Sequence, residues 1–288
     1  MTARSPIGAH VPVAGGLAKG GLKYAAEIGA EAIQVFVSNP RGWAQAAGRP
    51  AEDERLRAYS AEHDFPVFVH APYLVNVGSP SPDTLRRSIE SIRHALRRGA
   101  AIGARGVVVH TGSAVGRPYD AALRQIHEHL VPVLDEITDE GPDLLLEPMA
   151  GQGGMLCGTV RQLGPYLDAL DRHPRAGVCL DTCHAFAAGH DLAAPDGVRE
   201  TIDALIDTVG PGRLKLIHAN DSKDPCGSAR DRHENIGTGH IGAKPFAALF
   251  AHPATTGVPF ITETPGRDPK PHRKDIDTLK HLRCPSPV

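Results

Sequence analysis

Short runs of β-branched and other apolar residues recur along the whole chain. Their first residues lie 26 to 46 positions apart, and more polar segments separate them. The eight runs are Ile7–His10, Ile33–Val37, Val67–His70, Val107–His110, Leu144–Glu147, Val178–Asp181, Leu214–His218 and Phe260–Glu263. Short apolar runs of this kind are typical of strands that are buried on both faces. The pattern therefore predicts eight strands.

Several segments between these runs show helical periodicity. Examples are Leu17–Ile28, Asp83–Ala101, Ala121–Ile137, Thr159–Leu170 and Pro195–Val209. Strands that alternate with helices predict parallel strands joined by helical crossovers. Eight such units favour a single closed (β/α)8 barrel, a TIM barrel. The competing architecture is an open doubly wound sheet, but no Gly-x-Gly-x-x-Gly motif follows the first run.

Composition narrows the class of protein. No apolar run approaches 18 residues, which argues against a transmembrane helix and a membrane partner. The first 16 residues lack the apolar core of a secretory signal, and five scattered cysteines do not form a disulfide framework, so we expect a cytoplasmic protein. A formal net charge of −2 excludes a protein that binds nucleic acid through its overall charge alone, but it is compatible with a local basic groove. We expect a monomer with one barrel domain over residues 1–288 and a short flexible tail from about residue 283.

Six of the runs end on a residue type that binds metal ions: His70, His110, Glu147, Asp181, His218 and Glu263. Parallel strands point all their carboxyl ends at one rim of a barrel, where barrel enzymes carry their chemistry. Any one of these residues, taken alone, is more often an ordinary hydrogen-bonded side chain. Six together are three carboxylates and three imidazoles, and divalent cations are the natural source of compensating charge. The pattern predicts a metal cluster at the rim.

Two further clusters extend this candidate site. His184 follows Asp181 by three residues, where a helix should begin, and Asp231 and His233 lie in a polar, glycine-rich loop after the seventh run. Cys179 and Cys183 are alternative zinc ligands, but neither belongs to a Cys-x-x-Cys pair and we favour a structural role for both.

With these residues in view, the chain resembles the endonuclease IV family of apurinic/apyrimidinic endonucleases. The segments that carry the resemblance are IGAHVPVAGGL (7–17), FVSNPRGW (36–43), HAPYLVNVGSP (70–80), VVVHTGS (107–113), LLLEPMAGQGG (144–154), CLDTCHAFAAGHDL (179–192), HANDSKDPCGSARDRHENIGTGHIG (218–242) and ITETPG (261–266). The resemblance implies a TIM barrel that holds three zinc ions and cleaves DNA on the 5′ side of an abasic site.

The resemblance also implies a partition of the nine candidate ligands. His70 and His110 would bind the first ion, and Glu147 would bridge the first and second. Asp181, His218 and Glu263 would complete the second site, while His184, Asp231 and His233 would hold the third. We expect three Zn²⁺ ions, with Mn²⁺ as an alternative at one or more sites.

Substrate contacts are expected from the loops. Arg41 and Tyr73 match family residues that enter DNA at the damaged nucleotide, and Leu74 lies beside Tyr73. Lys223, Arg230, Arg232 and Lys244 are candidates for a local basic groove. Each of these residues also has a purely structural interpretation: Tyr73 as an aromatic side chain packed at the rim, and the arginines and lysines as ordinary surface charges.

These observations predict a metal-dependent hydrolase of abasic double-stranded DNA, in which Glu147 is the candidate catalytic residue that orients the nucleophilic water. The products would be a 3′-hydroxyl and a 5′-deoxyribose phosphate. The main alternative is a sugar isomerase or epimerase on a related metal barrel, which would lack the third-metal ligands. A non-catalytic metalloprotein is less compatible with nine ligands around accessible metal ions.

Overall fold

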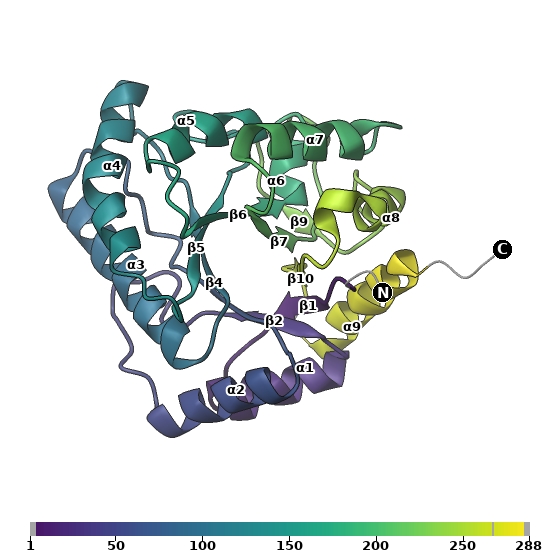
Figure 1. The fold of residues 1–288 in the computed structure, drawn as a ribbon. Coiled ribbons are helices and arrows are strands. Elements are labelled where there is room, and N and C mark those ends of the chain that lie inside the picture. The colour runs from purple at the N-terminus through teal and green to yellow at the C-terminus, as the bar shows by residue number, and fades with distance from the viewer. Residues whose placement is uncertain (1–3, 267, 285–288) are drawn as a thin grey trace.

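The protein is a closed eight-stranded parallel barrel surrounded by helices (Figure 1). The computed structural model describes residues 4–266 and 268–284. The barrel strands are β1 (Ile7–His10), β2 (Ala32–Val35), β3 (Val67–His70), β4 (Gly106–His110), β5 (Asp143–Glu147), β6 (Ala176–Asp181), β7 (Leu214–His218) and β10 (Phe260–Thr262). Strand β10 pairs with both β1 and β7, which closes the barrel. The predicted (β/α)8 architecture is confirmed.

The outer ring is helical. It contains η1 (Leu17–Leu22), α1 (Lys23–Ile28), α2 (Pro50–Glu62), α3 (Pro82–Ala101), α4 (Tyr119–Asp135), η2 (Val160–Gln162), α5 (Leu163–Asp168), α6 (Thr182–Ala187), α7 (Gly197–Val209), α8 (Lys244–Ala251), η3 (Pro253–Thr255) and α9 (Pro269–Arg283). A two-stranded ribbon, β8 (Asp221–Ser222) with β9 (His233–Glu234), lies outside the barrel sheet. Each of the five expected helical stretches overlaps an observed helix. The eight-unit pattern also implies helices after the second, seventh and eighth runs, where α2, α8 and α9 lie, but no residue bounds are expected for them from periodicity.

Strands β2, β4, β5 and β6 begin one or two residues earlier than the sequence-based expectation, and two strands differ at their carboxyl ends. Strand β2 ends at Val35, two residues early, and β10 ends at Thr262, so Glu263 lies just beyond its strand. Arg283 belongs to α9 and donates hydrogen bonds to the Ser5 carbonyl and to Glu31, whereas the flexibility of a tail from about residue 283 stays a prediction. Residues 285–288 of that tail lie outside the described residues.

An apolar layer fills the barrel interior. It consists of Ala32, Phe68, Val108, Leu145, Cys179, Leu216 and Ile261, one from each of seven strands. Successive side chains of a strand point to opposite faces, so the residue two positions further on also points inward. These next positions are Gln34, His70, His110, Glu147, Asp181, His218 and Glu263. Six of the nine candidate ligands, together with Gln34, thus form the polar layer directly above the apolar one.

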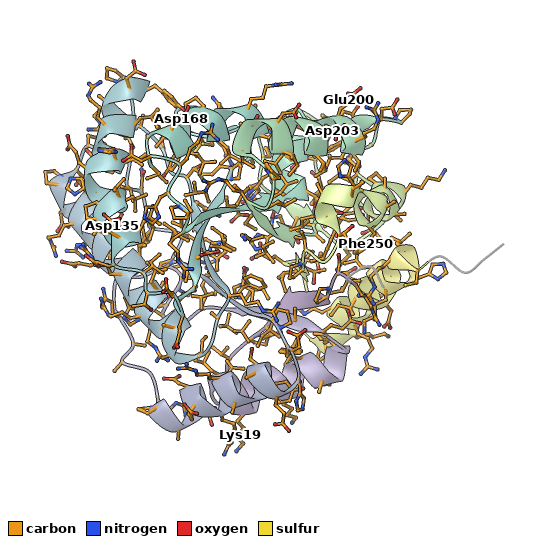
Figure 2. All side chains as sticks on the ribbon, in the orientation of Figure 1. Lys19, Asp135, Asp168, Glu200, Asp203 and Phe250 are labelled. Atoms are coloured by element: carbon orange, nitrogen blue, oxygen red, sulfur yellow. The ribbon has the colours of Figure 1, made fainter. Side chains whose placement is uncertain are left out.

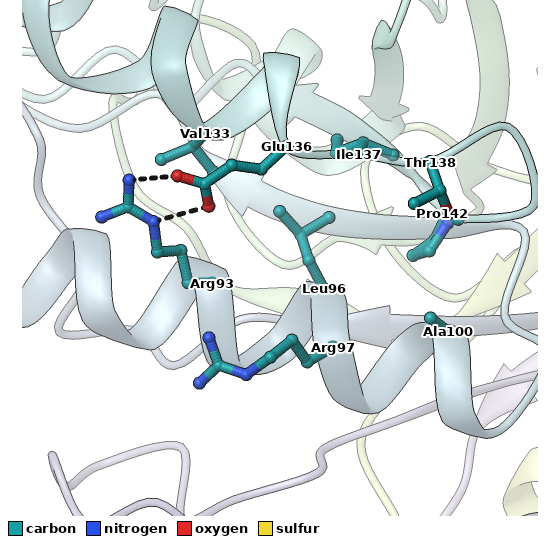
Figure 3. A pocket seen from close by; sticks show the side chains of 10 residues that line it. Arg93, Leu96, Arg97, Ala100, Val133, Glu136, Ile137, Thr138 and Pro142 are labelled. Atoms are coloured by element: carbon teal, nitrogen blue, oxygen red, sulfur yellow. Dashed lines mark hydrogen bonds and ion pairs between the residues drawn. The ribbon is translucent and has the colours of Figure 1, made fainter.

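A second and larger cluster of buried apolar side chains includes residues of both the strands and the helices, whereas Asp135, Asp168 and Glu200 are exposed on the outer helices (Figure 2). A pocket of about 300 Å³ lies between α3 and α4, where Arg93 pairs with Glu136 through contacts of 2.8 and 2.7 Å (Figure 3). Because Pro142 in the segment that leads into β5 lines it, this pocket is at the amino-terminal end of the barrel, away from the polar layer. No helix in the described part of the chain is long and apolar enough to cross a bilayer.

Candidate metal centre

The structure brings all nine sequence-predicted ligands together at the carboxyl ends of the strands. They form three groups: His70, His110 and Glu147; Glu147, Asp181, His218 and Glu263; and His184, Asp231 and His233. Two further combinations would include a cysteine, Cys179 with Glu147 and His218, and Cys183 with Asp181 and His233. Within each group the ligand atoms lie within 4.8 Å of one another. Glu147 belongs to two groups and therefore lies between them. This is the partition that the family resemblance implies.

Strand register explains why the first two groups meet. His110 on β4 is the direct neighbour of Glu147 on β5, and Asp181 on β6 is the direct neighbour of His218 on β7. The side chains of Glu147 and His218 are fully buried, whereas the Asp231 side chain is 40% exposed. The site therefore opens to solvent on the side of the third group.

Asp181 links the second group to the third. Its Oδ1 atom accepts a hydrogen bond of 2.9 Å from the backbone N–H of His184 and so caps the first turn of α6. Its Oδ2 atom accepts from the Asn220 amide at 2.7 Å and faces the His218 and His233 rings. One carboxylate thus starts the helix that carries His184 and also faces the central cluster.

The loop that carries Asp231 and His233 is folded around the buried carboxylate of Asp221. This carboxylate accepts hydrogen bonds from the backbone N–H groups of Ser222, Gly237, Gly239, Ile241 and Gly242. A Cβ atom on Gly239 would lie 2.3 Å from the Ser222 carbonyl oxygen, so only glycine fits this close approach. Pairing of Ser222 with His233 in the β8–β9 ribbon then holds the ligand loop over the barrel.

Hydrogen bonds fix which ring nitrogen faces the cluster in three of the histidines. The Nδ1 atoms of His70, His184 and His233 lie 2.6, 3.0 and 3.1 Å from the carbonyl oxygens of Ala71, Pro148 and Glu263. A carbonyl oxygen only accepts, so each Nδ1 carries a proton, and Nε2 is the nitrogen that faces the cluster and whose lone pair can bind a metal ion. Such outer contacts are usual around metal-binding histidines.

These lone pairs converge on carboxylate oxygens, an arrangement that needs a cation between them. Glu147 Oε2 lies 3.3 Å from His70 Nε2 and 3.4 Å from His110 Nε2, yet it is buried without a hydrogen-bond partner, as is His233 Nε2. Within the described chain, no lysine or arginine pairs with any of the four ligand carboxylates. Imidazole nitrogens and carboxylate oxygens suit Zn²⁺ or Mn²⁺, so the residues fit the expected metal ions.

The shifts in pKa report the same shortage of positive charge. Burial alone would raise the pKa of Glu147, but the His218 and His110 imidazoles outweigh it and hold this pKa well below its usual value. Burial lowers the pKa of His184, while Asp181 and Asp231 together raise it well above the ordinary value. The same balance, with Asp181 as the main opposing charge, raises the pKa of His233 to about 9. The Glu147 carboxylate therefore remains anionic at neutral pH and attracts cations.

The loops that follow β2 and β3 meet beside the first group. The Tyr73 N–H donates to the Pro40 carbonyl at 3.0 Å, which ties the Tyr73 loop to the loop that carries Arg41. The Tyr73 ring lies 6.0 Å from the His110 ring and nearly parallel to it. Among the described residues, the large hydrophobic side chains with high exposure are Tyr73, Leu74 and Val115, all on loops after β3 and β4. Arg41 is exposed as well.

The basic residues expected around the seventh-strand loop differ in their surroundings. Lys223 and Lys244 are exposed. The Arg232 guanidinium forms a two-pronged ion pair with Asp224, and Arg230 lies 3.7 Å from the same carboxylate. Asp224 thus draws both arginines towards its own side of the loop. A role in binding DNA stays a prediction for all four.

Sequence reasoning missed three side chains that support the ligands. Asn220 joins Asp181 to the Glu263 backbone, and Gln34 and His10 contact Glu263 and each other. A signal was available for two of them. His10 ends the first apolar run, and Gln34 is the polar residue inside the second run.

Comparisons with known proteins agree with this geometry. The model of a family described as xylose isomerase-like TIM barrel matches residues 22–283. Proteins named probable endonuclease 4 from Streptomyces avermitilis and Streptomyces coelicolor are each 61% identical over 282 residues, covering 97% of this chain and 91% and 96% of the relatives.

Solved structures support the same assignment. The crystal structure of endonuclease IV from Thermus thermophilus matches with a TM-score of 0.84 and 33% identity, over 96% of this chain and 98% of that one. A D-tagatose 3-epimerase-like protein matches with a TM-score of 0.70 at 20% identity, over 96% of this chain and 98% of that one, which shows a shared fold alone. By its sequence relatives and its closely similar fold, the chain belongs to the endonuclease IV family of xylose isomerase-like TIM barrels.

Proposed function

We propose that this protein is a metal-dependent endonuclease of DNA repair that hydrolyses the phosphodiester on the 5′ side of an abasic site. The observation that carries the proposal is the third group, His184, Asp231 and His233, which adjoins two further ligand groups that share Glu147. Three adjacent cation positions match the demands of a phosphodiester, whose reacting centre and leaving group both carry negative charge.

The nine ligands would hold three divalent cations, with Zn²⁺ as the favoured ion and Mn²⁺ as an alternative. Bound cations would supply hydroxide at neutral pH and neutralise the charge that develops on the phosphate and the leaving 3′-oxygen. Hydrolysis adds the water oxygen to phosphorus, breaks the bond from phosphorus to the 3′-oxygen and leaves the proton on that oxygen. The products are a 3′-hydroxyl and a 5′-deoxyribose phosphate.

Glu147 is the side chain best placed to orient the attacking water. It lies between the first two ligand groups, and its low pKa keeps it an acceptor at neutral pH. The phosphate would approach from the third group, because Asp231 is the exposed carboxylate among the ligands. Three protein ligands leave a cation there with an open position for an oxygen of the substrate.

Selection of abasic DNA would come from the exposed rim. An abasic nucleotide has no base to unstack or unpair. Its extrusion from the duplex therefore avoids the few kcal/mol that flipping an intact nucleotide costs. Tyr73 and Leu74 are exposed apolar side chains of the kind that wedge into duplexes, and Arg41 lies on the loop bonded to them. We propose that these loops fill the gap, with Lys223, Arg230 and Arg232 near the flanking backbone.

A sugar isomerase or epimerase is the second candidate, favoured only by the shared barrel fold. An experiment separates the two. A duplex with one tetrahydrofuran abasic analogue and a matched intact duplex are incubated with the protein, with and without EDTA, beside a panel of ketoses and aldoses. Incision of the abasic strand to an end that a polymerase extends, abolished by EDTA, supports the proposal. Sugar conversion without incision would overturn it.

A further inference from the structure

Gln34 lies in the ligand layer although it does not belong to the ligand set. It follows Ala32 of the inner apolar layer by two residues on β2, so its side chain points into the top of the barrel. Its side chain is fully buried. An amide in such a place is stable only when its donors and acceptor are satisfied.

The partners of the Gln34 amide determine its orientation. Its nitrogen lies 2.7 Å from Glu263 Oε1 and 3.0 Å from His10 Nδ1, and its oxygen lies 2.9 Å from His218 Nε2. An ionised carboxylate only accepts hydrogen bonds, so the NH₂ group must face Glu263 and the carbonyl oxygen must face His218. His218 then has to donate from Nε2.

This donation leaves the Nδ1 lone pair of His218 free to face the cluster. That atom lies 3.0 Å from Glu147 Oε1 and 3.3 Å from Glu263 Oε2. His70, His184 and His233 have the opposite arrangement, with Nδ1 bonded to a backbone carbonyl and Nε2 facing the cluster. The ring N–H of His218 that faces away from the cluster thus donates to a side chain, whereas the corresponding N–H groups of the other three histidines donate to backbone carbonyls.

We propose that Gln34 is a positioning residue of the second metal site: it holds His218 in the Nε2–H form and at the same time orients Glu263. Both residues belong to the group that also contains Glu147 and Asp181, so a single amide fixes two of its four ligands. His10 lies beside both the amide and Glu263: its Nδ1 atom is 3.0 Å from the amide nitrogen and 3.3 Å from Glu263 Oε1, and its ring packs 4.3 Å from the Phe36 ring. The inference rests on the proposed metal centre.

The test uses Gln34→Met, which keeps the volume and removes every hydrogen bond of the amide. The matched control is Thr262→Val, a buried β10 substitution on the opposite face from Ile261 and Glu263. Zinc affinity is measured by competition with a chromophoric chelator on the full chain. We expect one of the bound zinc ions to be held about 10- to 100-fold more weakly in Gln34→Met. The zinc affinity of the Thr262→Val control should remain within about twofold of the wild-type value, which is well below the change expected for Gln34→Met.

A second measurement needs no variant and so holds even where Gln34→Met fails to fold. Long-range ¹H–¹⁵N NMR of zinc-loaded wild-type protein reports which ring nitrogen of each histidine carries the proton. We expect Nε2–H for His218 and Nδ1–H for His70, His184 and His233. The inference is overturned by Nδ1–H at His218, or by a folded Gln34→Met protein with wild-type affinity for every zinc ion. Wild-type incision of abasic DNA in the same experiments would leave the proposed function standing.

Discussion

Replacing Asp221 with asparagine should open the loop that carries the third ligand group without unfolding the barrel. Oδ1 of Asp221 accepts from Ser222 and Ile241, and Oδ2 accepts from Gly237 and Gly239, at 2.8 to 3.0 Å. In Asp221→Asn one of these oxygens becomes an NH₂ group. At least two backbone N–H groups then face a donor in place of an acceptor.

The size of the effect follows from those lost bonds. A hydrogen bond to a charged group contributes about 1.5–3 kcal/mol, so two of them amount to about 3–6 kcal/mol for the loop. That is comparable with the whole stability of a typical domain, about 5–15 kcal/mol. We expect local opening rather than global unfolding, because the inner apolar layer of the barrel contains no residue of this loop.

Hydrogen exchange followed by mass spectrometry measures this opening. We expect exchange in residues 235–242 to accelerate at least about 100-fold in Asp221→Asn, since 1.36 kcal/mol corresponds to a factor of ten. Peptides from the barrel strands should keep their protection, and the third metal ion should be lost. Asp224→Asn is the matched control: it removes another acid of the same segment that pairs with Arg232 and Arg230. Wild-type protection in Asp221→Asn, or equal effects of the two variants, would refute the reasoning.

Three further outcomes are expected. Glu147→Gln should lower the incision rate by at least about 100-fold while the far-UV circular dichroism stays unchanged, because one bridging negative charge is removed; a wild-type rate in a gel assay would contradict the role of Glu147. Arg41→Ala and Tyr73→Ala should reduce the preference for abasic over intact duplex in a binding assay and leave metal content intact; unchanged selectivity in both would show that these loops do not face the DNA. Zinc binding to the metal-free protein at pH 7 should release protons, and its affinity should fall as the pH falls, because the pKa values of His184 and His218 are raised and that of His233 is raised to about 9. Calorimetry in two buffers of different ionisation enthalpy measures the release, and identical heats would exclude it.

The sequence predicts the barrel and the ligand layer well because both follow from local patterns. Each barrel strand is a short apolar run, and parallel pairing places the run ends on one rim without further information. His70, His110 and His218 are the last residues of their strands. Helix α2 was missed because Leu56 is its only fully buried large apolar side chain, so the segment has little periodicity to detect.

Local sequence patterns do not predict the contacts that orient the candidate ligands. Gln34 is separated from His218 by 184 residues and from Glu263 by 229, so only the closed barrel brings them together. The pairing of Arg232 with Asp224 likewise depends on how the loop folds back on itself. Residue types reveal candidate ligands, while their protonation and orientation depend on partners that are distant in sequence.

The central claim is that three metal ions at this rim carry out the cleavage of abasic DNA, and a metal count paired with incision tests it most directly. Elemental analysis is performed on metal-replete wild type and on Asp231→Ala/His233→Ala, and each sample is assayed on the abasic duplex before chelation, after chelation and after zinc is restored. We expect about three ions per chain in wild type and about two in the variant, in line with the ligand groups. Wild-type incision should disappear with the metal and return with zinc, and the variant should show little incision. Robust incision by fully metal-free protein, or a wild-type count of two or fewer, would contradict it.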